Sequence, residues 1–503
     1  MKKIIIIFSL LALLTGCDNG LDPEIYGSLT PANFPKTESE YELYTLEVYK
    51  PFTSKWGYSD GGISQNLFWG YEYSNVQLND ACTDLMSVAG AQGLFQEISK
   101  ANFLILKNEN TRSHIEKIRY ISKITTIIGD LEKATTISET AKARFIAESK
   151  TARGILMYHL LTMYGPVPVI LDANLIGTDA EKNLTRPERG TYVNGIIQDL
   201  LDAANVLEKS PSQYGRFNKG LALTYLMRTY LNEKDWSNAE IVGREIVDLG
   251  YNLVSNYKSL FVPSTERNTE TIYAISTDAS ANGGGLLGNM NAYSWYCYPV
   301  DFPGITQNGG WLGPNAFFTA SWEFYDSFDP ADKRRELLIP SYLAVNNRGG
   351  IPAGGTRDRS NMSGAVIMKY PDVETSSFAR GNDIPLARYA DVLLMLAEAI
   401  NNQDGPTSEA IGMVNSVRSK HGGLNNLSAG DTATKDAFAA AILKERGWDL
   451  FFEGYRRIDL IRFGKWNQAL QSVGKTPGPA LFPIPEYKIQ QSNNKLSQTD
   501  GWQ

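Results

Sequence analysis

The amino-acid sequence predicts a mostly α-helical fold, in which a scaffold of stacked helical hairpins carries one loop-rich region with short strands. Two observations lead to this prediction. Long segments before residue 252 and after residue 385 place apolar side chains at the three- and four-residue spacing of amphipathic helices. Between about residues 252 and 385, Gly, Pro, Asn and aromatic residues become dense, and short β-like pieces replace the helices. We therefore expect the helices to form the core and the intervening region to supply loops.

The helical segments have recognisable ends and a recognisable spacing. A helix is predicted over residues 141–164, because Gly165 followed by Pro166 is a common helix stop. Residues 219–250 and 388–420 each hold two helices whose small and large side chains alternate as in tetratricopeptide helix pairs. Hairpins of this kind cannot bury their apolar faces alone, so several must stack into one scaffold.

The N-terminus has the features of a secretory signal peptide. Lys2 and Lys3 precede an apolar run over residues 4–14, and small residues stand directly before Cys17. The apolar run is shorter than the roughly 20 residues that span a bilayer. The Leu-Thr-Gly-Cys pattern resembles a bacterial lipobox, in which Cys17 becomes the lipidated first residue of the mature protein. An ordinary cleaved signal peptide with an incidental cysteine is the alternative.

This interpretation divides the chain into a signal peptide (1–16), a lipidated tether (17–37) and a single domain (38–503). The acidic residues after the lipobox fit either retention at an inner membrane or the surface-export tether of Bacteroidetes lipoproteins, and both stay open. The remaining cysteines are Cys82 and Cys297. They could form one disulfide in an oxidising compartment, but their wide separation favours two separate small buried side chains.

Composition and motif content argue against several classes of function. The 503-residue chain has a net charge of -7 and no block of basic residues, so neither nucleic acid nor an anionic membrane surface is expected as a partner. A neutral or weakly charged ligand fits better. The histidines, His114, His159 and His421, lack the spacing of zinc ligands. We expect no catalytic residue, metal site or cofactor, although the many acidic residues leave a glycosidase pair open.

Two aromatic clusters form the candidate ligand-binding surface. One lies in residues 291–313, where Pro299 and Pro303 predict a long irregular loop instead of a helix, and the other in residues 66–80. A pyranose ring has an apolar face and a rim of hydroxyl groups, so flat aromatic rings beside amides suit it. The predicted glycan-binding residues are Trp69, Tyr71, Tyr73, Asn291, Trp295, Tyr296, Tyr298 and Trp311. The alternative is that these rings only pack the loops against the helices.

The C-terminal half carries four long motifs in one order. They are GNDIPLARYADVLLMLAEAIN, AIGMVNSVRSKHGGL, LKERGWDLFFEGYRRIDLIRFGKW and LFPIPEYKIQQSNNKLSQTDGW. Together with MYGPVPVI, GRFNKGLALTYLMRTYL and FYDSFDPADKRRELLI upstream, they closely resemble the SusD/RagB family of Bacteroidetes surface lipoproteins. The resemblance covers nearly the entire mature chain.

This resemblance implies a SusD-like fold with about four tetratricopeptide-like hairpins and a ligand face built from loops outside them. It implies a lid on a SusC-like TonB-dependent transporter, in the outer membrane and held at the cell surface by the lipid on Cys17. Proteins of this kind bind oligosaccharides or, in the RagB branch, peptides, and deliver them without chemistry. Charged residues of the third motif, such as Glu445, Arg446 and Asp459, are expected to hold the fold together.

We therefore expect a glycan-binding lipoprotein that is not an enzyme. A peptide-binding lid is the nearest alternative, and aromatic density with few basic residues in the loops favours sugar over peptide. A glycoside hydrolase or a purely structural lipoprotein are the alternatives from other classes.

Overall fold

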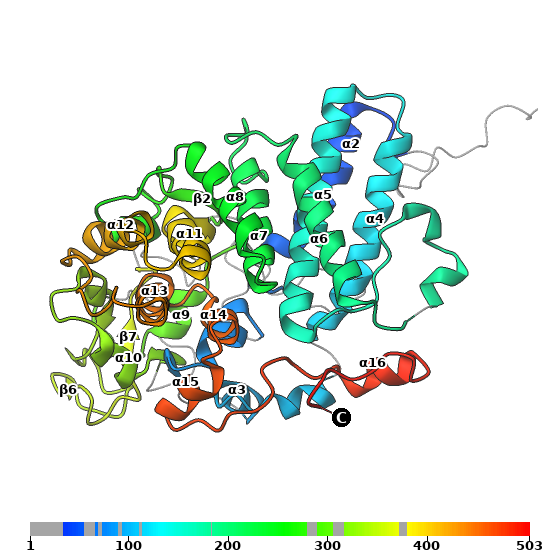
Figure 1. The fold of residues 1–503 in the computed structure, drawn as a ribbon. Helices are drawn as coiled ribbons and strands as arrows, with labels where there is room; N and C mark the ends of the chain where they lie inside the picture. The colour runs from blue at the N-terminus through cyan, green and yellow to red at the C-terminus, as the bar shows by residue number, and fades with distance from the viewer. Residues whose placement is uncertain are drawn as a thin grey trace, which may run out of the picture.

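The protein is described by a computed structural model. It covers residues 34–54, 66–68, 73–88, 93–109, 113–182, 184–278, 289–304, 316–371 and 380–502. Helices form the larger part of it and stand in a row across the molecule (Figure 1). The mostly α-helical fold class predicted from the sequence is confirmed.

The row of helices follows the order of the chain. Its members are α4 (Lys117–Lys133), α5 (Glu139–Tyr164), α6 (Arg189–Ala204), α7 (Lys219–Asn232), α8 (Trp236–Asp248), α11 (Tyr389–Asp404), α12 (Ser408–Val417) and α13 (Lys435–Leu450). From α4 to α8 each helix packs on the next, and α8 packs on α11, which carries both α12 and α13. The two predicted hairpins are therefore α7 with α8 and α11 with α12.

The longest helix of the row shows why these segments fold as predicted. Helix α5 begins where the Ser138 side chain accepts a hydrogen bond from the Ala141 N–H, and it ends at Gly165, whose φ is 74°. Most of its side chains are buried, so the helix packs on several sides. Arg153, a buried cation within it, forms a bidentate pair with Asp199 of α6 at 2.7 Å. The predicted stop at Gly165 is confirmed.

Shorter helices surround the row. The shorter α-helices are α2 (Glu38–Thr45), α3 (Gly93–Ser99), α9 (Tyr293–Cys297), α10 (Trp322–Ser327), α14 (Arg456–Arg462), α15 (Trp466–Ser472) and α16 (Glu486–Gln491). The 3-10 and π turns are η1 (Leu46–Phe52), η2 (Gln77–Ala81), η3 (Phe103–Asn108), η4 (His114–Glu116), η5 (Ala173–Leu175), η6 (Asp179–Lys182), η7 (Tyr257–Phe261), η9 (Lys333–Leu337) and η10 (Arg418–Gly422).

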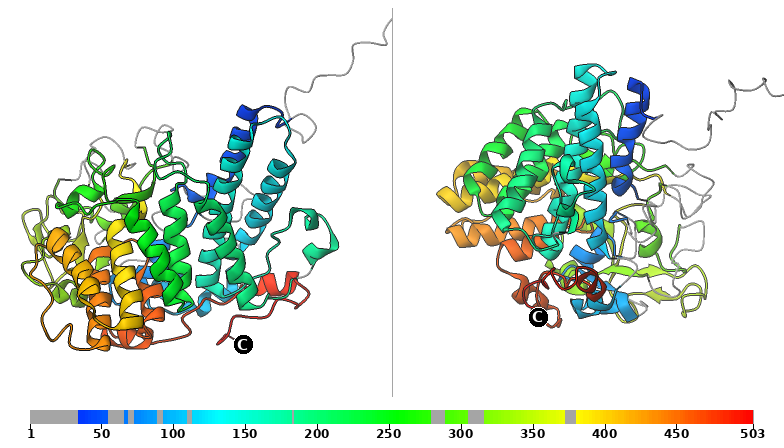
Figure 2. Two further views of the ribbon diagram at one scale, coloured as in Figure 1. Left: turned by 45° about the horizontal axis from the view of Figure 1, so that its top comes forward. Right: turned by 90° about the vertical axis from the view of Figure 1, so that its right-hand side faces the viewer.

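Short antiparallel strands occupy the loop-rich region. They are β1 (Met86–Val88), β2 (Thr271–Ile275), β3 (Phe318–Ala320), β4 (Leu338–Ile339), β5 (Tyr342–Leu343), β6 (Thr356–Arg357), β7 (Ala365–Ile367) and β8 (Ile384–Arg388). One sheet has the order β1-β3-β7-β4, and two further pairs join β2 with β8 and β5 with β6. The β-like pieces predicted in the loop-rich region are therefore real strands, β2 and β7. In the right-hand view of Figure 2, the yellow-green segment that carries β3 to β7 lies to one side of the helical row.

The stretch from residue 291 differs in part from its predicted irregular course. It contains the short helix α9, which ends at Cys297, two residues before Pro299. Proline excludes a helix through its own position but not a single turn before it. Cys297 and Cys82 are both buried free thiols, so the structure has them as separate small side chains and not as a disulfide.

One large cluster of buried apolar side chains runs through the fold, from Val48 near the beginning to Leu496 near the end. A smaller cluster lies in the loop-rich region around Tyr298, Phe302 and Tyr342. Within the described ranges, none of the helices has the length and apolarity required to cross a lipid bilayer. The predicted signal peptide, Cys17 and most of the predicted tether lie outside the described residues.

Candidate functional site

Hydrogen bonds from backbone and side chains bring together the ends of several loops at one place, which we call the loop base: Ser54, Asp278, Asn289, Asn291 and Arg380. The N–H of Ser54 donates to Oδ1 of Asn289 (2.8 Å), and the N–H of Asp278 donates to the Asn289 carbonyl (3.0 Å). The N–H of Asn291 donates to the carbonyl of Arg380 (2.9 Å). The loop base thus joins the ends of three chain segments outside the described residues. They are residues 55–65, 279–288 and 372–379.

Asn291, a predicted ligand-binding residue, uses its side chain to hold backbone at the loop base. Its Nδ2 donates to the carbonyl of Asn382 (2.9 Å), and its Oδ1 accepts from the N–H of Tyr293 (2.9 Å). The side chain is fully buried. Both the oxygen and the nitrogen of the side-chain amide are therefore bonded to backbone. The prediction that Asn291 contacts a glycan is corrected: the side chain holds backbone in the interior.

Three of the predicted tyrosines also lie in the interior. Tyr73 donates from its hydroxyl to Oε2 of Glu109 (2.6 Å), and its ring meets Phe95 edge-on. The ring of Tyr296 meets Phe317 edge-on. Tyr73 and Tyr296 are only 2% and 3% exposed. Neither offers the free face that stacking on a sugar requires.

Tyr298 belongs to the small apolar cluster of the loop-rich region. Its ring stacks on Phe302 with the centroids 5.3 Å apart, and its hydroxyl donates to the carbonyl of Tyr370 (3.2 Å). It is 2% exposed. Loops with little regular structure need large side chains to bury apolar area, which explains why these tyrosines pack inward. For Tyr73, Tyr296 and Tyr298 the alternative interpretation, packing of the loops, is the one that the structure supports.

The other predicted ligand-binding residues are not described. Trp69, Tyr71, Trp311 and the side chain of Trp295 lie outside the described part of the structure. Their proposed contact with a glycan stays a prediction. Phe68, directly before Trp69, is buried and stacks on Phe52 with the ring centroids 6.2 Å apart.

The ionic network around His421 was not predictable from the sequence, because the partners of His421 are distant in the chain. Its Nδ1 lies 2.6 Å from Oδ2 of Asp449, and its Nε2 lies 2.9 Å from Oε2 of Glu270. Arg388 bonds to both of these carboxylates and to Glu453. Burial opposes a charged imidazole, but the carboxylates of Asp449 and Glu270 outweigh it and raise the pKa of His421 to about 9.

We call the whole network the buried ion cluster. Its cations are Arg334, Lys369, Arg388, Arg418 and protonated His421, and its anions are Glu270, Asp332, Glu445, Asp449 and Glu453. The cations equal the anions in number when His421 is protonated. Every member has a partner of opposite charge, which is the condition for keeping ions away from water.

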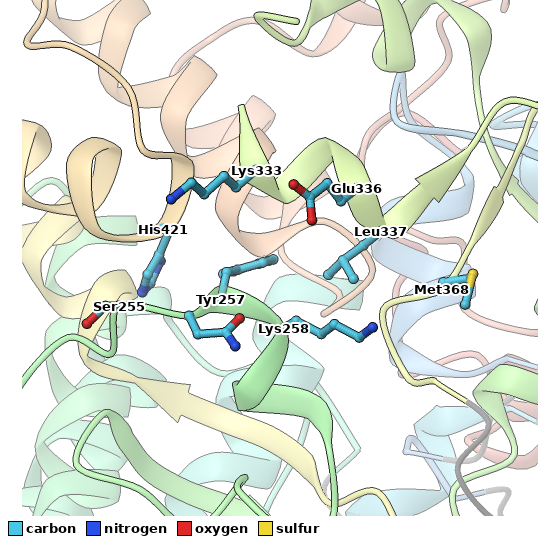
Figure 3. Close-up of a pocket in the computed structure, with 9 residues that line it drawn as sticks. Ser255, Tyr257, Lys258, Lys333, Glu336, Leu337, Met368 and His421 are labelled. Carbon is cyan, nitrogen blue, oxygen red and sulfur yellow. The ribbon is translucent and has the colours of Figure 1, made fainter. Parts of the chain in front are cut away.

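A pocket of about 260 Å³ lies beside this cluster (Figure 3). Lys333 and Glu336 border it on one side, Tyr257 and Lys258 border it on the other, and His421 lies at one end. Because both ring nitrogens of His421 are engaged, the imidazole is not available there as a base or a ligand. In the part of the chain that the structure describes, no group of three or more His, Cys, Asp or Glu side chains is arranged to hold a metal ion.

Comparison with known families identifies the fold. A family model described as "SusD family" matches residues 344–502, and a second, described as "Starch-binding associating with outer membrane", matches residues 63–231. The two ranges do not overlap and together cover more than half of the chain. The chain belongs to the SusD family. The resemblance inferred from the motifs is confirmed.

Relatives within the SusD family match almost end to end. "SusD-like protein P25" of Formosa agariphila is 22% identical, over 94% of this chain and 92% of its own length. "Starch-binding protein SusD" of Bacteroides thetaiotaomicron is 23% identical, over 74% of this chain and 75% of its own length.

Solved structures share the SusD fold with this chain. A "Laminarin binding SusD-like protein" has a TM-score of 0.74 at 23% identity and covers 93% of this chain and 100% of its own. "Surface glycan-binding protein A from Bacteroides thetaiotaomicron in complex with laminarihexaose" has a TM-score of 0.74 at 19% identity, over 92% of this chain and 100% of its own.

The charged residues of the third SusD motif hold the fold together, as the sequence predicted. Arg446 of α13 forms a bidentate pair with Asp459 of α14 and a third bond to Asp391 of α11 (2.7 Å). Asp391 also accepts from Arg228 of α7 (2.7 Å). The arginines on either side hold the pKa of the buried Asp391 at about 2 despite its burial, so this carboxylate stays charged.

Proposed function

We propose that this chain is a cell-surface glycan-binding protein that captures oligosaccharides and delivers them, chemically unchanged, to a SusC-like TonB-dependent transporter. One observation carries the proposal: over more than nine-tenths of its length the chain has the fold of proteins named for laminarin or glycan binding, one of them in complex with laminarihexaose. A matching family model described as starch-binding supports the same class of ligand.

The proposed ligand surface lies on the two aromatic-rich stretches of the chain, around residues 66–80 and 291–313. The rings that we propose to contact the glycan are Trp69, Tyr71, Trp295 and Trp311. The other predicted ligand-binding residues, Tyr73, Asn291, Tyr296 and Tyr298, are buried and are not part of this surface. Several rings are needed. A sugar ring on an indole removes on the order of 50 Å² of apolar surface from water, about 1–1.5 kcal/mol, so each ring alone binds weakly.

The proposed location is the outer membrane, with the protein held at the cell surface through lipidated Cys17. The Leu-Thr-Gly-Cys pattern before the tether supports the anchor. The description of the second family model, associating with outer membrane, supports the location. Delivery to a transporter rests on membership in the SusD family.

A glycan array followed by calorimetry tests the proposed function. The full-length mature protein is screened against laminarin, starch, other plant and microbial glycans, and peptides. We expect a glycan ligand, released unchanged, and about tenfold weaker binding for Trp69→Ala and for Trp311→Ala. Trp236→Ala, a half-buried ring on α8, is the matched control and should leave the affinity unchanged. Binding of peptides alone, or cleavage of the glycan, contradicts the proposal.

Membrane fractionation tests the location and the partner. Wild-type protein should sediment with outer membranes and co-purify with a large β-barrel protein in mild detergent, whereas Cys17→Ala should appear in the soluble fraction. Each acyl chain contributes about 0.8 kcal/mol per buried methylene, so loss of the lipid removes the anchor. A Cys17→Ala protein that stays in the outer membrane contradicts the lipid anchor, and a wild-type protein recovered alone contradicts the transporter partner.

A further inference from the structure

A cleft of about 420 Å³ lies outside the predicted aromatic clusters, and we call it the basic cleft. It runs between the turn at residues 209–218, the end of α8 and the start of β2. Its lining includes Lys209, Ser210, Tyr214, Tyr251, Arg267 and Asn268. The volume falls within the roughly 300–1,000 Å³ of ligand pockets.

An exposed ring is held rigidly in this cleft. Tyr214 is 47% exposed, and the guanidinium carbon of Arg267 lies 4.0 Å from the centroid of its ring. Its hydroxyl donates to Oδ2 of the buried Asp383 at 2.5 Å. Held at both its face and its hydroxyl, Tyr214 is a fixed aromatic platform with a substantial part of its surface open to ligand.

A second cation lies over a second ring of the same cleft. Nζ of Lys209 is 4.8 Å from the centroid of Tyr251, whose hydroxyl approaches Gly220 so closely that a Cβ there would lie 2.5 Å from it. Tyr251 is only 8% exposed, so it forms the wall of the cleft and not a platform. The ammonium group of Lys209 therefore lies over the wall that Tyr251 forms.

Of the three cations that line the cleft, Arg216 is paired with Glu42 and Glu148, whereas Lys209 and Arg267 are poorly neutralised. The contact of Arg267 with a carboxylate is a long one, 4.0 Å from Nε to Oδ2 of Asp383. Asp383 already accepts from Tyr214 and from the N–H of Thr277. Lys209 has no carboxylate within 4.0 Å among the residues that the structure describes. Both side chains are exposed, so together they give this cleft a positive potential in a chain whose net charge is -7.

The basic cleft adjoins the loop base. Asp383 bonds to Thr277, the residue before Asp278 of the loop base. Asn382, its neighbour in the chain, accepts from Asn291 of the loop base. The cleft and the loop base are therefore neighbours in the fold.

We propose that the basic cleft binds an acidic saccharide unit, one that carries a carboxylate or a sulfate group. The sugar ring lies on Tyr214, its anionic group meets Arg267 and Lys209, and its hydroxyl groups meet Ser210 and Ser212. A guanidinium offers two parallel N–H donors to the oxygens of a carboxylate or sulfate. This inference rests on the proposed function, which it deepens: the captured glycan contains acidic units. It replaces the expectation of a neutral or weakly charged ligand.

Calorimetry with small probes tests this cleft directly. The probes are trigalacturonate for the carboxylate, an oligosaccharide of sulfated galactose for the sulfate, and maltotriose as the neutral control. We expect at least one acidic probe to bind the wild-type protein with Kd of about 1 mM or below, more weakly at high salt. Arg267→Gln and Lys209→Gln should each weaken that binding about tenfold or more, without an effect on maltotriose.

A matched control comes from a similar pair elsewhere. Arg359 is exposed and lies over the ring of Trp322 (4.6 Å), so Arg359→Gln removes the same kind of cation and should leave acidic-probe binding unchanged. The inference is overturned if neither acidic probe binds at about 10 mM, or if Arg267→Gln and Lys209→Gln bind as the wild type does. If neutral glycans still bind when the inference is overturned in this way, the proposed function is not contradicted. Absence of binding by every glycan overturns both.

Discussion

The buried ion cluster and the loop base both join segments that are distant in the chain, but they do so with different chemistry. In the ion cluster, full charges pair with full charges, as when Arg388 bonds to Glu270, Asp449 and Glu453. At the loop base, neutral amides and hydroxyls bond to backbone, as when Ser54 bonds to Asn289. A neutral hydrogen bond contributes about 0.5–1.5 kcal/mol net, whereas an unpaired buried charge costs several times more. The buried ion cluster is therefore held by contacts whose loss is costly, and the loop base by contacts whose loss costs less.

Breaking the ion cluster should give the largest effect. Arg388→Met leaves three buried carboxylates without their shared cation, and we expect the free energy of unfolding to fall by about 3–5 kcal/mol. Urea denaturation followed by circular dichroism measures it. A loss below about 1 kcal/mol would show that water or the other cations of the cluster replace the arginine, and that the comparison with the loop base is wrong.

Raising the pH should weaken the same cluster to a smaller extent. The pKa of His421 rises from 6.5 to about 9 on folding, so its stabilising effect is full below pH 6.5 and is lost as the pH rises through 9. At about 1.4 kcal/mol per pH unit, the full loss is roughly 3 kcal/mol. Lys369 of the same cluster has its pKa lowered by burial to about 8, and its effect on stability has the opposite sign.

The free energy of unfolding must therefore be compared between two proteins that both contain Lys369, so that the effect of this lysine cancels. We expect the stability difference between wild type and His421→Gln to shrink as the pH rises from 6.5 to 9 and beyond. A difference that stays constant over this range would contradict a protonated His421 in the cluster.

The fold was predictable from the sequence where local spacing decides it. Apolar periodicity with Gly165 as a stop gave the end of α5, and paired helical patterns gave the hairpin of α7 and α8. The strands β2 and β7 followed from short β-rich runs between turn residues. Each of these rests on neighbours within a few turns of chain, which is the information that a single sequence contains.

The inward or outward direction of a loop ring was not predictable. Tyr298 is buried because Tyr370, 72 residues later, accepts its hydroxyl and because Phe302 stacks on it. An aromatic-rich loop has the same composition whether its rings face solvent or core. The basic cleft was not predictable for the same reason: Tyr214 and Arg267 belong to separate segments that meet each other and Asp383, which is still later in the chain.

Removing a buried ring of the loop-rich region should have an intermediate effect. Tyr298→Leu keeps an apolar side chain but loses the stacking on Phe302 and the bond to Tyr370, so we expect a loss of about 1–3 kcal/mol of stability. Because Tyr298 is buried, glycan affinity measured by calorimetry should change less than twofold. A tenfold fall in affinity with unchanged stability would restore Tyr298 to the ligand surface.

An exposed ion pair should give the smallest effect and sharpens the contrast with Arg388. Arg244 of α8 makes bonds of 2.8 and 3.0 Å to Glu409 of α12 and another to Glu240, but the side chains of Arg244 and Glu409 are 45% and 50% exposed. Water and salt screen such a pair, so Arg244→Met should cost less than about 1 kcal/mol, and less still in high salt. Denaturation of Arg244→Met beside Arg388→Met, the same substitution at a buried site, measures how much of the cost comes from burial. Equal losses in the two variants would mean that the number of bonds decides the stability and that the separation of buried from exposed ions explains nothing.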